Sequence, residues 1–119
     1  MIVGLDHVQL AIPPGSEERC RAFYVGLLGM TELAKPPGLA ARGGLWVKGG
    51  AAEIHLGVEQ DFRPARKAHP AVTVDDIDAL AERLTAAGCD VRWDDVLADT
   101  RRFFTHDPLG NRLELIAAP

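Results

Sequence analysis

Two stretches of this sequence alternate polar and apolar residues: Leu5-Asp-His-Val-Gln-Leu-Ala-Ile12 and His69-Pro-Ala-Val-Thr-Val74. Side chains project to opposite faces along a strand, so a period of two predicts a β-strand with one buried face. After each stretch, apolar residues recur with the period of an amphipathic helix. Both stretches therefore predict the same local unit, a strand followed by a helix.

The two predicted helices have clear starts and stops. The first begins near Ser16 and ends before Gly29, and its apolar stripe consists of Cys20, Phe23, Tyr24 and Leu27. The second begins at Asp75 or Asp76 and ends before Gly88, with a stripe of Ile77, Leu80, Ala81 and Leu84. Three short strands are expected after each helix, near 31–35, 41–48 and 52–58 and near 90–94, 101–106 and 112–117.

The spacings of the two halves match. His69 lies 62 residues after His7, and Glu114 lies 59 residues after His55. The difference of three arises in the turn at 13–16, which is longer than its counterpart in the second half. A repeat of this length indicates two modules of the order βαβββ, an α+β fold.

Length and composition agree with a small globular protein. The chain has 119 residues, of which 47% are hydrophobic and 25% charged, and domains commonly contain about 100 to 150 residues. One helix cannot cover both faces of a four-stranded sheet. We therefore expect a single domain of residues 1–119, built from modules at about 1–60 and 67–119.

Charge and hydropathy exclude several classes of function. Thirteen basic residues against seventeen acidic ones give a net charge of -4, which disfavours nucleic-acid binding. No apolar run approaches the ~20 residues of a membrane span, and the N-terminus has no cleavable apolar segment. We expect a cytoplasmic protein without a membrane partner. Cys20 and Cys89 have no metal or redox spacing and are expected to be structural thiols.

The polar faces of the predicted strands hold a candidate metal site. By alternation, His7 and His55 face away from the apolar side of the first module, and His69 and Glu114 do so in the second. His7 matches His69 in the repeat, and His55 matches Glu114. A single strand histidine is usually solvent-facing or hydrogen-bonded, but four such groups at repeated positions favour a shared ligand.

Three imidazoles and one carboxylate suit Zn, Fe(II), Ni or Mn. Four protein ligands on a six-coordinate ion leave two positions for substrate or water. Glu114 is the carboxylate of the set and hence the candidate catalytic base.

Four further residues are candidates for substrate binding. Arg63 and Arg66 belong to the one locally basic stretch, which is either a solvated loop or an electropositive rim that attracts an anionic substrate. Trp46 and Phe103 either line an apolar pocket or fill the core. His106 precedes a turn at Asp107-Pro108 and is expected to be exposed.

Five motifs resemble the vicinal oxygen chelate superfamily, which includes glyoxalase I, extradiol dioxygenases, and fosfomycin- and bleomycin-resistance proteins. They are Leu5-Asp-His7-Val, Phe23-Tyr-Val-Gly-Leu-Leu-Gly29-Met, Ile54-His55-Leu, His69-Pro-Ala-Val-Thr-Val-Asp-Asp76 and Asp107-Pro-Leu-Gly-Asn-Arg-Leu-Glu114-Leu. The resemblance covers nearly the whole chain, and the last motif is its most specific part.

The resemblance implies a curved mixed sheet around a cleft, with a divalent metal held at His7, His55, His69 and Glu114. It also implies a homodimer and a metal-dependent enzyme acting on a small oxygen-rich substrate, either a glyoxalase-like lyase or isomerase or an extradiol-type dioxygenase. The alternative is a metal-free protein that sequesters a small molecule, as bleomycin-resistance proteins do.

Two departures from the family pattern bear on the reaction. Metal-dependent glyoxalase I usually has Glu where this chain has His55, which leaves Glu114 as the only carboxylate ligand. Ring-cleaving dioxygenases generally add second-shell His and Tyr residues, whereas the only Tyr here, Tyr24, is expected in the helix core. The sequence therefore leaves the choice of reaction open.

Overall fold

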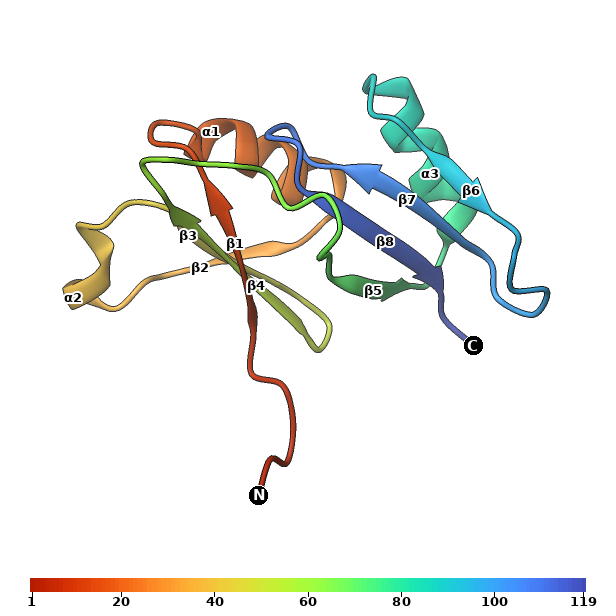
Figure 1. Cartoon of the computed structure of the whole chain (residues 1–119), viewed down its shortest axis with the longest axis horizontal. Helices are drawn as coiled ribbons and strands as arrows, with labels where there is room; N and C mark the ends of the chain where they lie inside the picture. The colour runs from red at the N-terminus through yellow and green to blue at the C-terminus, as the bar shows by residue number, and fades with distance from the viewer. The chain divides into compact units, whose positions relative to one another are not determined.

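The computed structural model describes residues 1–119, which divide into two compact units, Met1–Arg63 and Pro64–Pro119. The first unit contains β1 (Val8–Ile12), α1 (Glu17–Cys20), η1 (Arg21–Leu27), β2 (Thr31–Leu33), α2 (Pro37–Ala40), β3 (Leu45–Gly49) and β4 (Ala52–Val58). The second contains β5 (Ala71–Val74), α3 (Ile77–Ala86), β6 (Arg92–Asp94), β7 (Arg102–His106) and β8 (Arg112–Ala117). Figure 1 shows these elements in chain order by colour.

Each unit has a four-stranded mixed sheet with the same topology. The strand orders are β1-β4-β3-β2 and β5-β8-β7-β6. In both sheets the first and last strands pair in parallel, and the other neighbours pair antiparallel. The predicted fold, two tandem βαβββ modules, is confirmed.

The helix of the second unit forms as predicted. The carboxylate of Asp76 accepts a hydrogen bond from the backbone N–H of Ala79 at 3.0 Å, which makes Asp76 the N-cap. The predicted stripe is the buried face of α3. Gly88 ends the segment with a φ of 86°, a conformation that favours glycine.

The helix of the first unit differs from the prediction. Only Glu17–Cys20 is α-helical, and Arg21–Leu27 is a π-helix. The hydroxyl of Ser16 donates to the carbonyl of Pro13 at 2.6 Å and makes no cap hydrogen bond to the helix. Of the predicted stripe, Cys20, Phe23 and Tyr24 are buried, whereas Leu27 is only partly buried.

Several strand boundaries also differ. The first strand begins at Val8, and Leu5 is 80% exposed because the residues before β1 have no strand partner. The third predicted strand begins at Leu45 because Gly43 and Gly44 precede it with φ of 75° and 77°. A Cβ on Gly44 would lie 2.1 Å from the carbonyl oxygen of Leu56, so only glycine permits this approach.

One face of each sheet is apolar and belongs to the core. In the first unit the buried strand residues are Leu10, Ile12, Leu45, Val47, Ile54 and Leu56, and in the second they include Phe103, Leu113 and Leu115. Helix α3 lies against its own sheet (Figure 1) and buries its stripe there. The opposite faces carry the polar candidates, as alternation requires. None of the helices is long and apolar enough to cross a membrane.

Candidate metal centre

The polar face of the first unit is built on a stack of three rings. The imidazoles of His7 and His55 are stacked with centroids 3.8 Å apart, and Trp46 stacks on the other side of His55 at 3.9 Å. Trp46 and His55 are register partners in β3 and β4, so the sheet itself places them side by side. His55 is only 5% exposed because it lies between the two other rings.

Carboxylates hold the outer nitrogens of both histidines. Nδ1 of His7 lies 2.8 Å from Oδ1 of Asp6, and Nε2 of His55 lies 2.7 Å from Oε2 of Glu53. The hydrogen bond to His7 lowers the pKa of Asp6. An ionised carboxylate only accepts, so each of these nitrogens donates its proton. In the neutral tautomers, Nε2 of His7 and Nδ1 of His55 then carry the free lone pairs.

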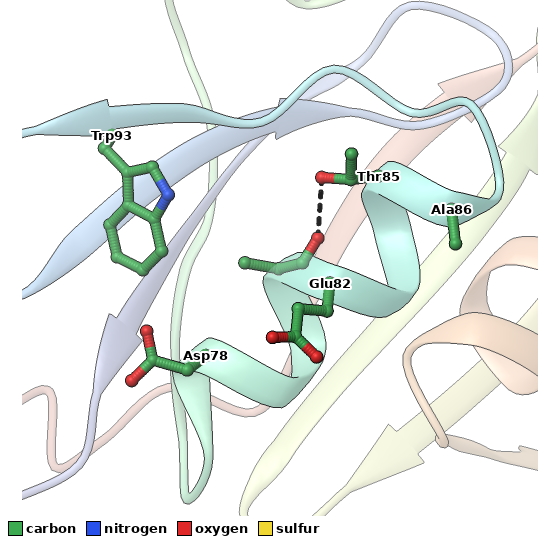
Figure 2. Close-up of a pocket in the computed structure, with 6 residues that line it drawn as sticks. Asp78, Glu82, Thr85, Ala86 and Trp93 are labelled. Atoms are coloured by element: carbon green, nitrogen blue, oxygen red, sulfur yellow. Dashed lines mark hydrogen bonds between the residues drawn. The ribbon is translucent and has the colours of Figure 1, made fainter.

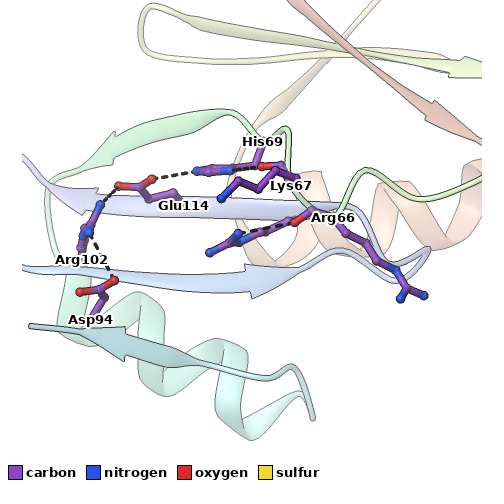
Figure 3. Close-up of polar contacts among 7 residues, drawn as sticks. Arg66, Lys67, His69, Asp94, Arg102 and Glu114 are labelled. Carbon is purple, nitrogen blue, oxygen red and sulfur yellow. Dashed lines mark hydrogen bonds and ion pairs between the residues drawn. The ribbon is translucent and has the colours of Figure 1, made fainter. Parts of the chain in front are cut away.

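In the second unit, four side chains form a continuous polar network across the strands. Nε2 of His69 lies 2.9 Å from Oε1 of Glu114, and Nη1 of Arg102 donates to Oε2 of Glu114 at 3.0 Å. Arg102 also donates to Asp94 at 3.2 Å. Figure 3 shows the chain of contacts from His69 through Glu114 and Arg102 to Asp94.

Glu114 is held in its charged form. Burial opposes ionisation, but hydrogen bonds from His69 and Arg102 and the charge of Arg102 outweigh it and lower the pKa of Glu114. The residue is 7% exposed. A buried, ionised carboxylate with an aligned imidazole is therefore present on this face.

The imidazole of His69 is oriented by a backbone carbonyl on the side away from Glu114. Its Nδ1 lies 2.9 Å from the carbonyl oxygen of Lys67, which can only accept. Nε2 is the nitrogen that faces Glu114, and it is the atom of His69 that would bind an ion held by Glu114.

The turn before β8 fixes the segment that carries His69. Asn111 is buried, and its side-chain oxygen accepts from the backbone N–H of Ala65 at 2.9 Å. The backbone N–H of Arg112 donates to the carbonyl of Ala65 at 2.9 Å, and that of Glu114 donates to Pro70 at 3.0 Å. The Asp107-Pro-Leu-Gly-Asn111 turn thus positions both His69 and Glu114, which lie 45 residues apart in sequence.

The strand registers place the four predicted ligands at equivalent positions. His55 pairs with Gln9, and His7 precedes Gln9 by two residues. Glu114 pairs with Ala71, and His69 precedes Ala71 by two residues. Each unit therefore brings one predicted pair together, His7 with His55 and His69 with Glu114.

The predicted ligands fit a metal ion in their chemistry. The 2.9 Å between Nε2 of His69 and Oε1 of Glu114 matches the separation of neighbouring ligand atoms that each lie ~2.1 Å from one ion. Imidazole nitrogens and a carboxylate oxygen suit borderline divalent metals. Within either unit, however, no group of three or more His, Cys, Asp or Glu side chains is arranged to hold an ion.

The predicted substrate-binding residues have different surroundings. Trp46 lies on the polar face, and Arg63 and Arg66 are exposed in the loop between β4 and β5. Phe103 is fully buried beside Leu113 and Leu115 in the core. Its neighbour Phe104 pairs with Glu114 in register and is the counterpart of Trp46, because a shift of one residue moves a side chain to the other face.

Three charged side chains that bind the predicted ligands were not predicted to do so: Asp6, Glu53 and Arg102. Glu53 could have been found by alternation, since it lies two residues from His55. Arg102 could not, because its contact with Glu114 depends on the pairing of β7 with β8. His106 is half-exposed and ends β7 opposite Arg112, with Nδ1 2.9 Å from Oδ2 of Asp90.

A cavity of about 460 Å³ in the second unit lies on the helix side of the sheet (Figure 2). It is lined by Asp78, Ala81, Glu82, Thr85, Ala86 and Trp93. Trp93 pairs with Phe103 and so projects to the side away from Glu114. This cavity contains none of the predicted site residues.

Comparisons with known proteins agree with this architecture. The model of the Glyoxalase/Bleomycin resistance protein/Dioxygenase superfamily matches residues 4–115. A solved structure described as a "putative glyoxalase family protein from Bacillus anthracis" is 48% identical with a TM-score of 0.95, covering 100% of this chain and 98% of that one. No curated protein sequence matches.

Two more distant structures share the fold. Fosfomycin resistance protein FosX from Listeria monocytogenes is 19% identical with a TM-score of 0.78, covering 100% of this chain and 96% of that one. Lactoylglutathione lyase from Agrobacterium tumefaciens is 18% identical with a TM-score of 0.69, covering 93% and 92%. With its repeated βαβββ units and its family match, the chain belongs to the glyoxalase/bleomycin resistance protein/dioxygenase superfamily, the vicinal oxygen chelate proteins.

Proposed function

We propose that this protein is a metal-dependent enzyme acting on a small oxygen-rich substrate, with His7, His55, His69 and Glu114 as the ligands of one divalent ion. The observation that carries the proposal is the equivalence of the two pairs: in each unit the first ligand lies two residues before the register partner of the second. Members of this superfamily typically use a divalent metal. Iron, zinc, nickel and manganese all suit the donor set.

The proposed site combines donors from both units, either of one chain or of two chains in a homodimer, because neither unit alone brings three together. We therefore take residues 1–119 as one domain whose two βαβββ units act together. A homodimer is part of the proposal, and the mass of the protein in solution tests it. A cytoplasmic location is also part of the proposal.

The ion would supply a Lewis acid that stabilises negative charge on a substrate oxygen. Side chains of the protein would take the proton, position the base and contact the substrate. Glu114 is ionised and is the candidate base that takes a proton from the substrate. Arg102 holds the carboxylate of Glu114 from the side opposite His69. Trp46 offers an apolar wall beside His55.

Two reaction classes fit these groups. A lyase or isomerase needs one base next to a carbonyl, and Glu114 supplies one. A dioxygenase needs two His and one carboxylate with open positions, and His69, Glu114 and a histidine of the first unit supply that set. Similar structures carry both kinds of name, a lactoylglutathione lyase and a glyoxalase/dioxygenase from Nostoc punctiforme.

A second function is favoured by one observation. Each of the three histidines already has an acidic partner in its own unit, at 2.7 to 2.9 Å. These contacts give at least one ring nitrogen of each histidine a partner without an ion, and the stacked Trp46 and His55 form a flat aromatic surface. Metal-free sequestration of a small molecule, as in bleomycin resistance, is therefore the alternative.

Elemental analysis tests the metal. Protein purified without a chelator or a metal-binding tag should contain about one equivalent of metal per chain. His69→Ala and Glu114→Ala should each lose it, whereas His106→Ala, a histidine outside the set, should keep it. No uptake by the wild type after reconstitution with Fe(II), Zn, Ni and Mn would falsify the metal enzyme and leave sequestration.

Activity assays separate the reactions. The Fe(II) protein under air is tested with catechols, and the Ni or Zn protein with thiol adducts of 2-oxoaldehydes. Turnover of one class, lost in Glu114→Gln, identifies the reaction. Turnover that survives in this variant would exclude Glu114 as the base.

A further inference from the structure

Arginines lie on three strands of the second sheet, and they differ in their partners. Arg92 on β6 lies 3.9 Å from Asp90, and Arg102 on β7 binds both Asp94 and Glu114. Arg112 on β8 has no carboxylate within 4.0 Å, and its guanidinium contacts a ring and a carbonyl instead. Arg112 is half-buried as a residue, and no carboxylate neutralises its charge.

The guanidinium of Arg112 contacts an aromatic ring and a backbone carbonyl. Its Cζ lies 4.1 Å from the centroid of the Phe104 ring, and Nη1 lies 3.5 Å from the carbonyl oxygen of Arg66. The backbone N–H of Arg112 is held by Ala65. Contact with the ring restricts the guanidinium of Arg112, so less conformational entropy is lost when this group binds a ligand.

Arg112 faces the same side of the sheet as Glu114. The two residues are separated by one position on β8, which places their Cα atoms ~7 Å apart along the strand. Phe104 is the register partner of Glu114, and it contacts His69 edge-on at 5.5 Å between centroids. The cation, the ring and the candidate metal ligands thus share one surface.

Lys67 adds a second charge. Its carbonyl holds His69, and its side chain points along the side of the sheet that carries Glu114, whereas Arg66 points away (Figure 3). No carboxylate lies within 4.0 Å of the Lys67 amine. In a chain with a net charge of -4 this is a local excess of positive charge.

We propose that Arg112, assisted by Lys67, binds an anionic group of the substrate, a phosphonate, phosphate or carboxylate, next to the atoms that react beside Glu114. Arginine presents two parallel N–H donors that match the oxygens of such groups. The inference uses one part of the proposed function, namely that the substrate binds beside His69 and Glu114. It restricts the substrate class to small oxyanions.

The test uses metal-stripped protein at low ionic strength, with inorganic phosphate, methylphosphonate and acetate as probes and amide NMR shifts as the readout. Shifts should concentrate at Lys67, Phe104 and Arg112. Arg112→Gln should weaken binding at least about tenfold. The control is Arg83→Gln, which removes the same charge from the exposed side of α3 and should bind as the wild type does.

Lys67→Gln provides a second variant, because the Lys67 side chain has no ring contact whose loss could unfold the sheet. It should weaken binding less than Arg112→Gln. If none of the three anions binds the wild type, or if both variants bind as tightly as the wild type, the proposal is wrong. Because these titrations contain no metal, their failure is distinct from a failure of metal uptake.

Discussion

The polar faces of the two units differ at the position two residues before the second predicted ligand. In the first unit this position is Glu53, which binds His55. In the second it is Arg112, which has no acidic partner and lies two residues before Glu114. The pairing of β3 with β4 and of β7 with β8 makes these residues equivalent. Equivalent positions of the two units thus carry opposite charges, negative at Glu53 and positive at Arg112.

The forces that hold the ligands differ accordingly. His55 is held by ring stacking between His7 and Trp46 and by one contact with Glu53, whereas Glu114 is held by an ionic network with both His69 and Arg102. The energy of a ring contact depends little on charge. Charged hydrogen bonds in a buried network are strong, and removal of any one side chain of the network weakens the others. The second unit should therefore be the more sensitive to substitution.

The largest effect is expected for Glu114→Gln. The amide keeps the shape but loses the charge, so metal affinity should fall at least about 100-fold, more than for a residue that only contacts a ligand. Competition with a chromophoric chelator measures it. An affinity equal to that of the wild type would show that the ionic network of the second unit has no part in metal binding.

Arg102→Gln should have the next largest effect. It removes the hydrogen bond that holds Oε2 of Glu114, and metal affinity should fall about 10- to 100-fold. The control is the adjacent Arg101→Gln, whose side chain pairs with Asp78 instead. Equal losses in both variants would mean that general charge, and not the contact with Glu114, is responsible.

Asn111→Ala should destabilise the second unit. Its buried side chain accepts from Ala65, and loss of a buried hydrogen bond costs about 1 to 3 kcal/mol. Denaturant unfolding measures the change. Thr105→Val is the matched control, because the buried hydroxyl of Thr105 has no partner and its removal should cost little or nothing.

Trp46→Leu tests the first unit. The variant loses the ring contact with His55, and the free energy of unfolding should fall by about 0.5 to 1.5 kcal/mol beyond the loss of area. The NMR resonances of the His55 ring should shift, while those of His69 remain. Trp93→Leu, at the half-exposed ring on β6, is the control that should leave His55 unchanged.

The smallest effect concerns Glu17, which ties the first helix to a loop. Its carboxylate accepts from the backbone N–H of Gly44 at 2.9 Å, and this bond lowers its pKa. A lowered pKa stabilises the fold at pH values above the unfolded pKa, and the gain disappears as the pH falls through the folded pKa. The stability difference from Glu17→Gln should stay below about 1 kcal/mol and shrink under about pH 4. A difference that grows on acidification would contradict the assignment.

Much of the fold could be predicted from local pattern. Alternation of polar and apolar residues located the strands, and apolar residues with a period of 3.6 located the buried stripe of α3. Both patterns arise because each element buries one face. The π-helix at Arg21–Leu27 and the short α2 were missed. The same apolar stripe is compatible with either helix type, and four residues are too few to show a period.

The candidate site was predictable in position but not in contacts. The adjacent Phe103 and Phe104 show why: both are aromatic, and only the pairing of β7 with β8 decides which one faces the core. The same pairing brings Arg102 to Glu114. Strand alternation places Arg101 and Arg102 on opposite faces, but it does not show that Arg102 binds Glu114 or that Arg101 pairs with a helix residue.

The sequence by itself determined that two βαβββ units repeat, and that His7, His55, His69 and Glu114 occupy equivalent polar positions, because alternation and spacing are properties of the chain alone. Only the tertiary structure decided the partners of these residues. His69 and Glu114 are 45 residues apart, and Asn111 reaches Ala65 across 46. Such contacts depend on strand register and on how the loops close. Register is in turn set by the packing of the whole sheet and not by any single residue.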